Sequence, residues 1–350
     1  MDFSKPDNAR TINRLRVLSE LRKGQASKAE LSRKLGINKV SIGEMTDKMI
    51  SEGLIEEGEK DFSSPGRPGR LLSINKDKGR VFAFCVSKRV VSVSVSDLLG
   101  RVLRFERYPR KDDMLENIQR AIARMSDKAT IYGSAAIIPE DFDTSILPSP
   151  ILCVNRAEAE AESEIMRIGK SDGMLFLSWS DTFDAAIIRN GELNHLPDLA
   201  HIKAQRDGEC TCGGRGCLEA AASGNALLSK TGAESIKDLV RNNSYGYAVK
   251  EAMRPLAAAL AEAVQALSAS SVMITGELSQ LSDEAYAYLQ ELLHSVLPPY
   301  RKDIPVYRSL SGDNGQREGA AIMALDAFFY RSLLLEKLDA IENLSSVFQT

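Results

Sequence analysis

The chain has 350 residues, of which 43% are hydrophobic and 27% charged, and its formal net charge is −3. This composition is typical of a folded globular protein and excludes the fibrous and disordered classes. The longest apolar runs, such as 256–267, fall short of the roughly 18 residues of a membrane span, and charged residues interrupt the first ten positions, where a secretory signal would lie. We therefore expect a cytoplasmic protein without a membrane partner.

Charge is distributed unevenly along the chain. Residues 1–80 contain 17 Lys and Arg against 12 Asp and Glu, a net of +5, whereas the rest of the chain carries −8. A basic segment suits a polyanion, because each phosphate that Lys or Arg neutralises releases condensed counterions. A modest excess is equally typical of solvated helix faces, so the charge alone leaves both interpretations open.

Apolar residues between 8 and 55 recur at helical spacing in three short blocks separated by turn signals. The first block spans 12–21. The second begins at Ser27, which forms a Ser-x-x-Glu capping pattern with Glu30. The third block follows Asn38, and its apolar residues are Val40, Ile42, Met45, Met49 and Ile50. Short helices joined by a tight glycine turn predict a helix-turn-helix.

Two short strand patterns follow the helices, at 54–58 and 71–74, and a polar segment joins them. Together they predict a wing. The segment between them reads Ser-Ser-Pro-Gly-Arg-Pro-Gly-Arg, in which Pro and Gly hold the backbone extended and leave Arg67 and Arg70 projecting. Such an arm fits a narrow, A·T-rich minor groove. The alternative is an interdomain linker with incidental charge.

The third helix is the predicted reader of duplex DNA. The residues expected nearest to the groove are Asn38, Lys39, Ser41, Ile42 and Glu44. Lys39 and Ser41 can donate to phosphate or bases, whereas Asn38 either pairs with adenine or caps the helix, and capping is the better interpretation. Ser27 and Lys28, at the start of the second helix, complete the predicted DNA contacts. A winged helix used for protein contacts is the alternative.

The rest of the chain alternates between strand and helix patterns. Val alternates with Ser within 81–109, as in antiparallel strands with one buried face. Helical patterns at 255–269 and 318–335 supply covering layers. Such alternation predicts an α/β fold.

The most specific string in the sequence holds Cys210, Cys212 and Cys217, separated mainly by glycines, with His201 nine residues before the first of them. Three thiolates and one imidazole form the usual closed tetrahedron of structural Zn²⁺, and the glycines let the loop curl around the ion. Because four protein ligands leave no open position, we expect a structural rather than a catalytic zinc. A chance cluster of buried cysteines is the alternative.

The stretch 200–223, AHIKAQRDGECTCGGRGCLEAAAS, resembles the zinc loop of the ROK family, which contains sugar kinases and sugar-responsive repressors. The segment SKAELSRKLGINKVSIGEMTDKMISEGLIEE with GRPGRLL is similar to the DNA-binding half of the repressor branch, and SDLLGRVL, VMITGEL and GQREGAAIMAL resemble parts of the kinase-like core. The resemblance implies a winged helix-turn-helix domain at 1–76, then two actin-like α/β lobes with a cleft at 77–350, a zinc loop at 201–219, and assembly as a homodimer or tetramer.

Three positions that phosphoryl transfer needs depart from the family pattern. The Asp-x-Gly turn of the first hairpin is replaced by Cys-Val-Ser at 85–87, and bulky residues fill the glycine-rich phosphate turn at 178–184. Arg156 follows Asn155, where the family has the general base. A guanidinium cannot accept a proton from a sugar hydroxyl. We therefore expect a protein that is not an enzyme; the alternative is a sugar kinase that carries a DNA-binding domain.

The resemblance places Asn155, His201 and Glu219 at sugar-contact positions. Asp198 stands where the family has Glu, and the segment 137–154 is shorter than its counterpart, which helps to line the sugar site. These departures put the usual sugar ligand in doubt.

Arg156 leaves two interpretations of the ligand site open. Its charge favours an anionic effector such as a phosphorylated or acidic sugar. Alternatively, it pairs with Glu158 or Glu160 and seals an empty cleft.

The leading hypothesis is a homodimeric repressor of carbohydrate-related genes, whose paired winged helices read a two-fold DNA operator. A repressor that responds to no ligand is the alternative.

Overall fold

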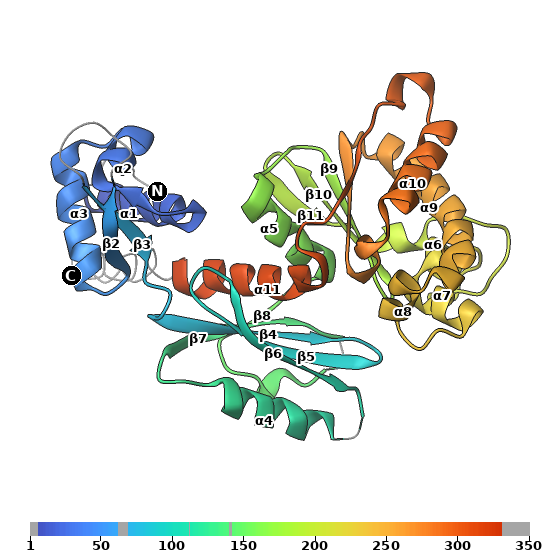
Figure 1. Cartoon of the computed structure of the whole chain (residues 1–350), viewed down its shortest axis with the longest axis horizontal. Helices are drawn as coiled ribbons and strands as arrows, with labels where there is room; N and C mark the ends of the chain where they lie inside the picture. The colour runs from blue at the N-terminus through green and yellow to red at the C-terminus, as the bar shows by residue number, and fades with distance from the viewer. Residues whose placement is uncertain (1–5, 62–68, 112, 140–141, 331–350) are drawn as a thin grey trace, which may run out of the picture.

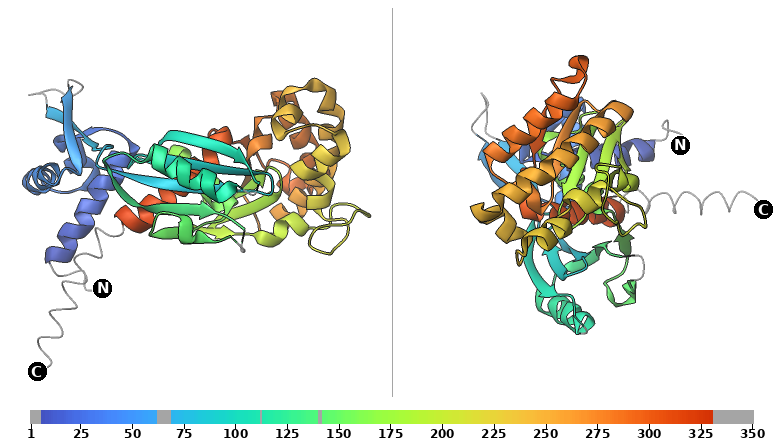
Figure 2. Two further views of the ribbon diagram at one scale, coloured as in Figure 1. Left: turned by 90° about the horizontal axis from the view of Figure 1, so that it is seen from below. Right: turned by 90° about the vertical axis from the view of Figure 1, so that its right-hand side faces the viewer.

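The computed structural model describes residues 6–61, 69–111, 113–139 and 142–330. An N-terminal helical unit and two lobes, each built on a sheet, follow one another along the long axis of the molecule (Figures 1 and 2). No helix of these ranges is both long and apolar enough to cross a membrane.

The N-terminal unit is a winged helix-turn-helix. Three helices pack on a three-stranded antiparallel sheet of order β1-β3-β2. Its elements are α1 (Pro6–Lys23), β1 (Ala26–Ser27), α2 (Lys28–Leu35), α3 (Lys39–Ser51), β2 (Ile55–Asp61) and β3 (Gly69–Ile74).

Local capping chemistry sets the helix boundaries, as the sequence predicts. The Ser27 N–H donates to Glu30 Oε2 at 2.9 Å, and the Glu30 N–H donates to Ser27 Oγ at 3.4 Å, which completes the capping box of α2. Gly36 ends that helix at φ +67°, in the left-handed region that glycine enters most easily. Asn38 Oδ1 then accepts from the Ser41 N–H at 2.8 Å and caps α3.

The first lobe is a five-stranded sheet of order β6-β5-β4-β7-β8, in which the first three strands are antiparallel and the last two run parallel to β4. Helix α4 (Met114–Met125) covers one face and α11 (Gly315–Leu325) the other (Figure 1). The strands are β4 (Gly79–Val86), β5 (Val90–Ser96), β6 (Val102–Pro109), β7 (Thr130–Ile137) and β8 (Ile151–Cys153).

The second lobe repeats this plan with the order β11-β10-β9-β12-β13. Such repetition is the two-lobed actin-like arrangement that the sequence predicts. Its strands are β9 (Met174–Trp179), β10 (Phe183–Arg189), β11 (Glu192–His195), β12 (Ser271–Thr275) and β13 (Val306–Arg308). Helix α5 lies on one face, and the remaining helices lie on the other (Figure 1). These helices are α5 (Arg156–Ile168), α6 (Leu218–Ala222), α7 (Gly224–Thr231), α8 (Ile236–Arg241), α9 (Gly246–Ala266) and α10 (Asp283–Val296).

Two helix predictions differ from the structure in their bounds. Helix α9 begins nine residues before the predicted start and carries Pro255 inside it. A proline costs a helix one hydrogen bond, but the buried apolar side chains of α9, among them Met253 and Leu256, offset that cost. The last predicted helix, 318–335, begins at Gly315, ends at Leu325 and continues as a π-helical turn over Asp326–Tyr330, and its predicted part at 331–335 lies outside the described residues.

Helices α5 and α11 cross between the lobes with backbone against backbone. A Cβ atom placed on Gly319 would lie 1.5 Å from the Ala159 carbonyl oxygen, so only glycine permits this approach. At its far end, α11 leads to the N-terminal unit, where Arg22 forms an ion pair with Asp326 and its guanidinium lies 4.3 Å from the centre of the Tyr330 ring. One cluster of buried side chains continues from α1 into this end of α11.

Candidate functional site

The buried and exposed faces of α3 correct part of the predicted DNA surface. Ile42 is fully buried, together with Thr46 and Met49, so its predicted place in a DNA groove is wrong. Val40, which the sequence assigned to the apolar block, is 70% exposed. The reason is helical geometry, because two residues turn the helix by about 200° and put Val40 and Ile42 on nearly opposite faces.

The exposed residues at the start of α3 include Asn38, Lys39 and Glu44, and Ser41 is half-buried. Asn38 holds the helix cap, as the sequence favoured. Lys39 forms no ion pair with any described residue, so its ammonium is available to an outside partner.

The predicted contacts at the start of α2 change as well. Ser27 is 4% exposed and its hydroxyl belongs to the capping box, so its side chain is engaged inside the protein. Lys28 lies at the surface and forms an ion pair with Asp47 of α3, which holds the two helices together.

The wing is built as predicted from β2 and β3, with Arg70 at the start of β3. Its side chain is 57% exposed, and its Nε lies 3.5 Å from Glu57 Oε2. Arg67 and the tip of the wing at 62–68 lie outside the described residues.

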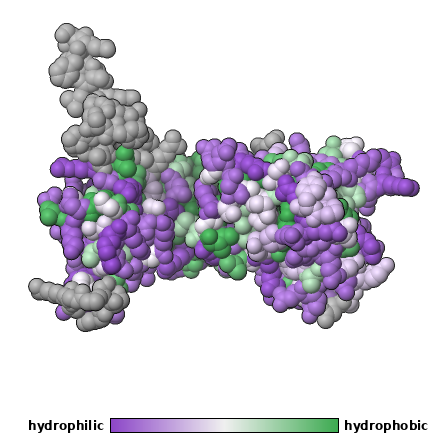
Figure 3. Space-filling view, turned by 90° about the horizontal axis from the view of Figure 1, so that it is seen from above, coloured by the Kyte–Doolittle hydropathy of each residue, from purple (hydrophilic) through white to green (hydrophobic). Residues whose placement is uncertain are grey.

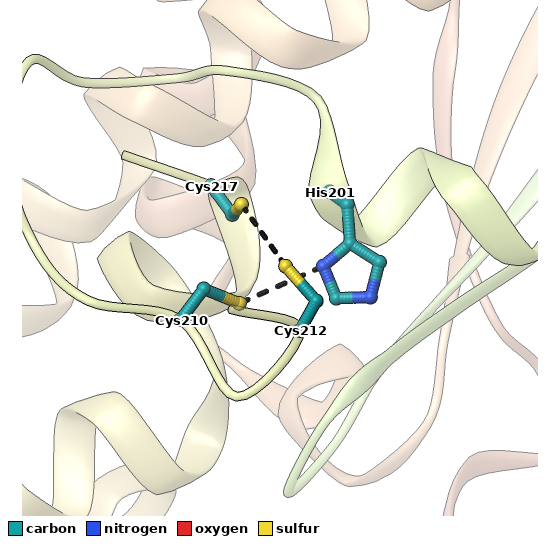
Figure 4. Close-up of side chains that lie close together, drawn as sticks. All are labelled: His201, Cys210, Cys212 and Cys217. Carbon is teal, nitrogen blue, oxygen red and sulfur yellow. Dashed lines mark hydrogen bonds between the residues drawn. The ribbon is translucent and has the colours of Figure 1, made fainter. Parts of the chain in front are cut away.

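His201, Cys210, Cys212 and Cys217 meet in a cluster whose ligand atoms all lie within 4.8 Å of one another (Figure 4). His201 Nδ1 is 3.6 Å from Cys210 Sγ, and Cys212 Sγ is 3.7 Å from Cys217 Sγ. Donors on a tetrahedron around Zn²⁺, with bonds of about 2.3 Å to sulfur and about 2.1 Å to nitrogen, lie about 3.6–3.8 Å apart. The four side chains therefore fit a tetrahedral metal ion of this type.

The glycines of this loop make the approach of the donors possible. Gly216 has φ +74°, and a Cβ there would lie 2.2 Å from the Gln205 carbonyl oxygen. The Gly214 N–H donates to Cys212 Sγ at 3.4 Å, which lowers the pKa of Cys212. Burial raises the pKa of Cys217 to about 11. A thiolate ligand at Cys217 therefore requires a cation that replaces its proton.

A cleft of about 550 Å³ opens between the two lobes. Its lining includes five cations and three acids. Arg107 pairs with Glu277 at 2.9 Å, and Lys237 pairs with Asp313 at 3.1 Å. Among the described residues, Lys88 and Arg89 have no ion pair, and both lie on the turn between β4 and β5 at the cleft wall.

The two turns that would hold phosphates are closed by their own side chains. In the β4–β5 turn, Ser87 Oγ accepts from the N–H groups of Arg89 at 3.3 Å and Val90 at 3.1 Å. In the β9–β10 turn, Asp181 Oδ1 accepts from the Thr182 N–H at 2.9 Å. A phosphate needs free amides, and these three are engaged within the turns.

Arg156 lines the cleft from the second lobe and closes the β9–β10 turn of the same lobe. Its Nη1 is 2.5 Å from Asp181 Oδ1, and Nη2 donates to Thr182 Oγ1. The predicted pairing with Glu158 or Glu160 is therefore wrong. Glu158 instead accepts from Asn155 Nδ2 at 2.8 Å.

Buried groups behind the cleft are held largely uncharged. Burial raises the pKa of Glu160 to about 7, and its Oε2 accepts from Thr275 Oγ1 at 2.5 Å. Burial also raises the pKa of Cys85, which lines the cleft, to about 12 and so favours the neutral thiol at this position.

The residues predicted to contact a sugar do not lie together in one site. Only Arg156 lines the cleft. Glu219 accepts from the Phe183 N–H at 2.8 Å, directly after the turn that Arg156 closes. Asp198 and His201 lie exposed on a turn of 3₁₀ helix, and His201 belongs to the cysteine cluster. The exposed Val40 was not predicted, because only tertiary packing decides it. The closure of the β4–β5 turn by Ser87 was also missed, although its local signal is a serine two and three residues before the amides from which it accepts.

Comparison with known proteins supports these observations. The xylose repressor of Caldicellulosiruptor bescii is 26% identical over 261 residues, which cover 62% of this chain and 65% of that protein. The DNA-binding transcriptional dual regulator NagC of Escherichia coli is 23% identical, with 82% of this chain and 85% of the relative aligned.

A crystal structure of a ROK family transcriptional regulator, a homologue of the E. coli MLC protein, superposes with a TM-score of 0.69 at 19% identity, and covers 94% of this chain and 99% of its own. This likeness confirms the fold. The ROK family model matches residues 149–327, which are more than half of the chain. The chain therefore belongs to the ROK family.

Proposed function

We propose that this chain is a DNA-binding transcriptional regulator, a repressor of carbohydrate-related genes whose kinase-like lobes do not catalyse. The observation that carries the proposal is the contrast between α3, whose cation Lys39 is exposed and unpaired, and the phosphate turns, whose amides are occupied. The names of its relatives, xylose repressor and NagC, support the same assignment.

The lobes have the roles of assembly and sensing in this proposal. A homodimer, or a tetramer of such dimers, presents two winged helices to a two-fold operator. A structural Zn²⁺ held by His201, Cys210, Cys212 and Cys217 keeps the loop at 201–219 folded.

Selection of DNA from a random pool by the full-length chain tests the DNA-binding function. We expect enrichment of a two-fold symmetric sequence, with affinity that falls as salt rises. Failure to enrich any sequence overturns the proposal.

The absence of catalysis has its own test. Incubation with ATP, Mg²⁺ and a panel of sugars should yield no sugar-dependent ADP. Release of ADP with any sugar would support the kinase alternative.

Two possibilities remain for the control of this regulator: a small-molecule effector, or no ligand at all. Lys88 and Arg89, the unpaired cations of the cleft, favour a sugar or sugar phosphate as effector, whereas the Arg156–Asp181 pair favours a regulator that responds to no ligand. Thermal shift with neutral and phosphorylated sugars, followed by operator-binding assays, separates them. A sugar that both raises the melting temperature and weakens operator binding identifies the effector class.

A further inference from the structure

The outward face of α3 consists of Lys39, Val40, Gly43, Glu44 and Asp47, and we refer to it as the recognition face. Within the described parts of the N-terminal unit, Val40 is the only large apolar side chain that is mostly exposed. Charged side chains surround it on the recognition face, so it is an isolated methyl-bearing group and not part of an apolar patch. In Figure 3, the face of the molecule in view is likewise mainly hydrophilic with separate apolar spots.

Gly43 lies one helical turn after Val40; its carbonyl oxygen accepts from Thr46 Oγ1 at 3.0 Å, but no described neighbour requires position 43 to lack a side chain. A Cβ placed on it would meet no atom within 4 Å, and its backbone has no positive φ. Glycine inside a helix costs roughly 1 kcal/mol relative to alanine. By contrast, Gly319 and Gly224 occupy places where a Cβ would collide with neighbouring backbone. The remaining physical reason for Gly43 is close approach of an outside surface.

We propose that the recognition face lies in the major groove of DNA, with Gly43 at the point of closest approach and Val40 against the C5-methyl group of a thymine. This inference rests on the proposed DNA-binding function and names two specificity-determining residues for it. Residues three apart lie about 5–6 Å from each other on one helix face. Val40 and Gly43 can therefore face neighbouring base pairs. The C5-methyl group of thymine is exposed only in the major groove, so an apolar contact with it distinguishes thymine from the other bases.

The charge of the whole N-terminal segment favours DNA over a protein partner, although the recognition face itself sets Lys39 against Glu44 and Asp47, of which Asp47 is paired with Lys28. Residues 1–80 carry a net charge of +5, and Lys39 beside Val40 has no intramolecular acid partner among the described residues. A protein interface of this size would bury a cluster of apolar side chains, whereas the recognition face offers one.

Deoxyuridine substitution tests the role of Val40. The full-length chain is titrated with its selected operator, in which each thymine of one half-site is replaced in turn by deoxyuridine, so that only a methyl group is lost. We expect the affinity to fall about fourfold at one thymine. With Val40→Ala, the same substitution should change the affinity by less than a factor of two. Val296→Ala, which shortens an exposed valine of α10, is the matched control and should retain the full methyl effect.

Gly43→Ala tests the close approach. We expect operator affinity to fall by at least tenfold, while the melting temperature stays the same or rises because alanine is the better helix former. Gly246→Ala, at another helical glycine with open space around it, should leave operator affinity unchanged.

The results distinguish a failure of this inference from a failure of the proposed DNA-binding function on which it rests. If no DNA is enriched in the selection, the proposed function fails. If an operator is found but no single thymine methyl matters, or if Gly43→Ala binds as tightly as the natural chain, the DNA-binding function stands and this assignment of residues is overturned.

Discussion

The exposed start of α3 and the two turns at the interlobe cleft differ in how their polar groups are paired, although Lys88 and Arg89 at the cleft wall also have no ion pair with any described residue. On α3, Lys39 and the open position at Gly43 have no partner in the protein. In the cleft, Ser87 and Asp181 occupy the turn amides, and Arg156 neutralises Asp181. A surface that binds an outside partner leaves groups unsatisfied, whereas the amides of these two turns already have partners inside the chain. The contrast is consistent with a partner-binding surface on α3 and leaves these turn amides engaged, where a phosphate would need them free.

The four donors of the cysteine cluster face one another and not an outside partner. We therefore expect the loss of one donor to have the largest effect on the protein. Cys212→Ser removes one of four donors, and we expect zinc content to fall from about one ion per chain to near none, with a lower melting temperature. Elemental analysis and calorimetry measure both. Cys153→Ser, at an exposed cysteine outside the cluster, is the control. Unchanged zinc content in Cys212→Ser would contradict the site.

Breaking the Arg156–Asp181 ion pair should have the second-largest effect. Arg156→Met leaves Asp181 without its partner in a mostly buried place, and we expect a loss on the order of 3 kcal/mol in the free energy of unfolding. Denaturant titration measures it. The double variant with Asp181→Asn should recover part of the loss. If the single variant is as stable as the natural chain, the pair does not stabilise the β9–β10 turn.

Lys39→Ala should weaken DNA binding through α3 and leave the stability of the fold unchanged. We expect roughly tenfold weaker operator binding at fixed salt, about 1.4 kcal/mol, and an unchanged melting temperature. Fluorescence anisotropy over a series of salt concentrations measures both the affinity and its salt dependence. Lys237→Ala, at the cleft, should bind the operator normally.

Glu160 provides the most gradual effect, because it is spread over a range of pH. Because burial raises its pKa from 4.5 to about 7, the folded chain holds this proton more tightly than the unfolded chain. Stability should therefore fall as pH rises from about 4.5 to about 7, by at most about 1.4 kcal/mol for each pH unit. Glu160→Gln should flatten this part of the profile, measured by denaturation between pH 5 and pH 8. An identical slope in both proteins would show that other groups control it.

Features with local chemistry were predictable from the sequence, and features that depend on tertiary packing were not. The caps at Ser27 and Asn38 and the cysteine spacing each have a local pattern, and the structure reproduces them. The sequence did not show which face of α3 is buried. Val40 and Ile42 are both apolar, and only their packing partners distinguish them. The partner of Arg156 was missed because Asp181 lies 25 residues away on another element.

The bare crossing of α5 and α11 has a mechanical consequence. At Gly319 the backbones of the two helices touch, and beside this point Glu318 of α11 accepts from Ser163 of α5 and pairs with Arg167 of α5, which fixes their distance and their rotation together. From this point, α5 extends to Arg156 at the cleft, and α11 extends to Asp326, which pairs with Arg22 of the N-terminal unit. The two helices therefore connect the wall of the cleft to the N-terminal unit through one continuous set of contacts.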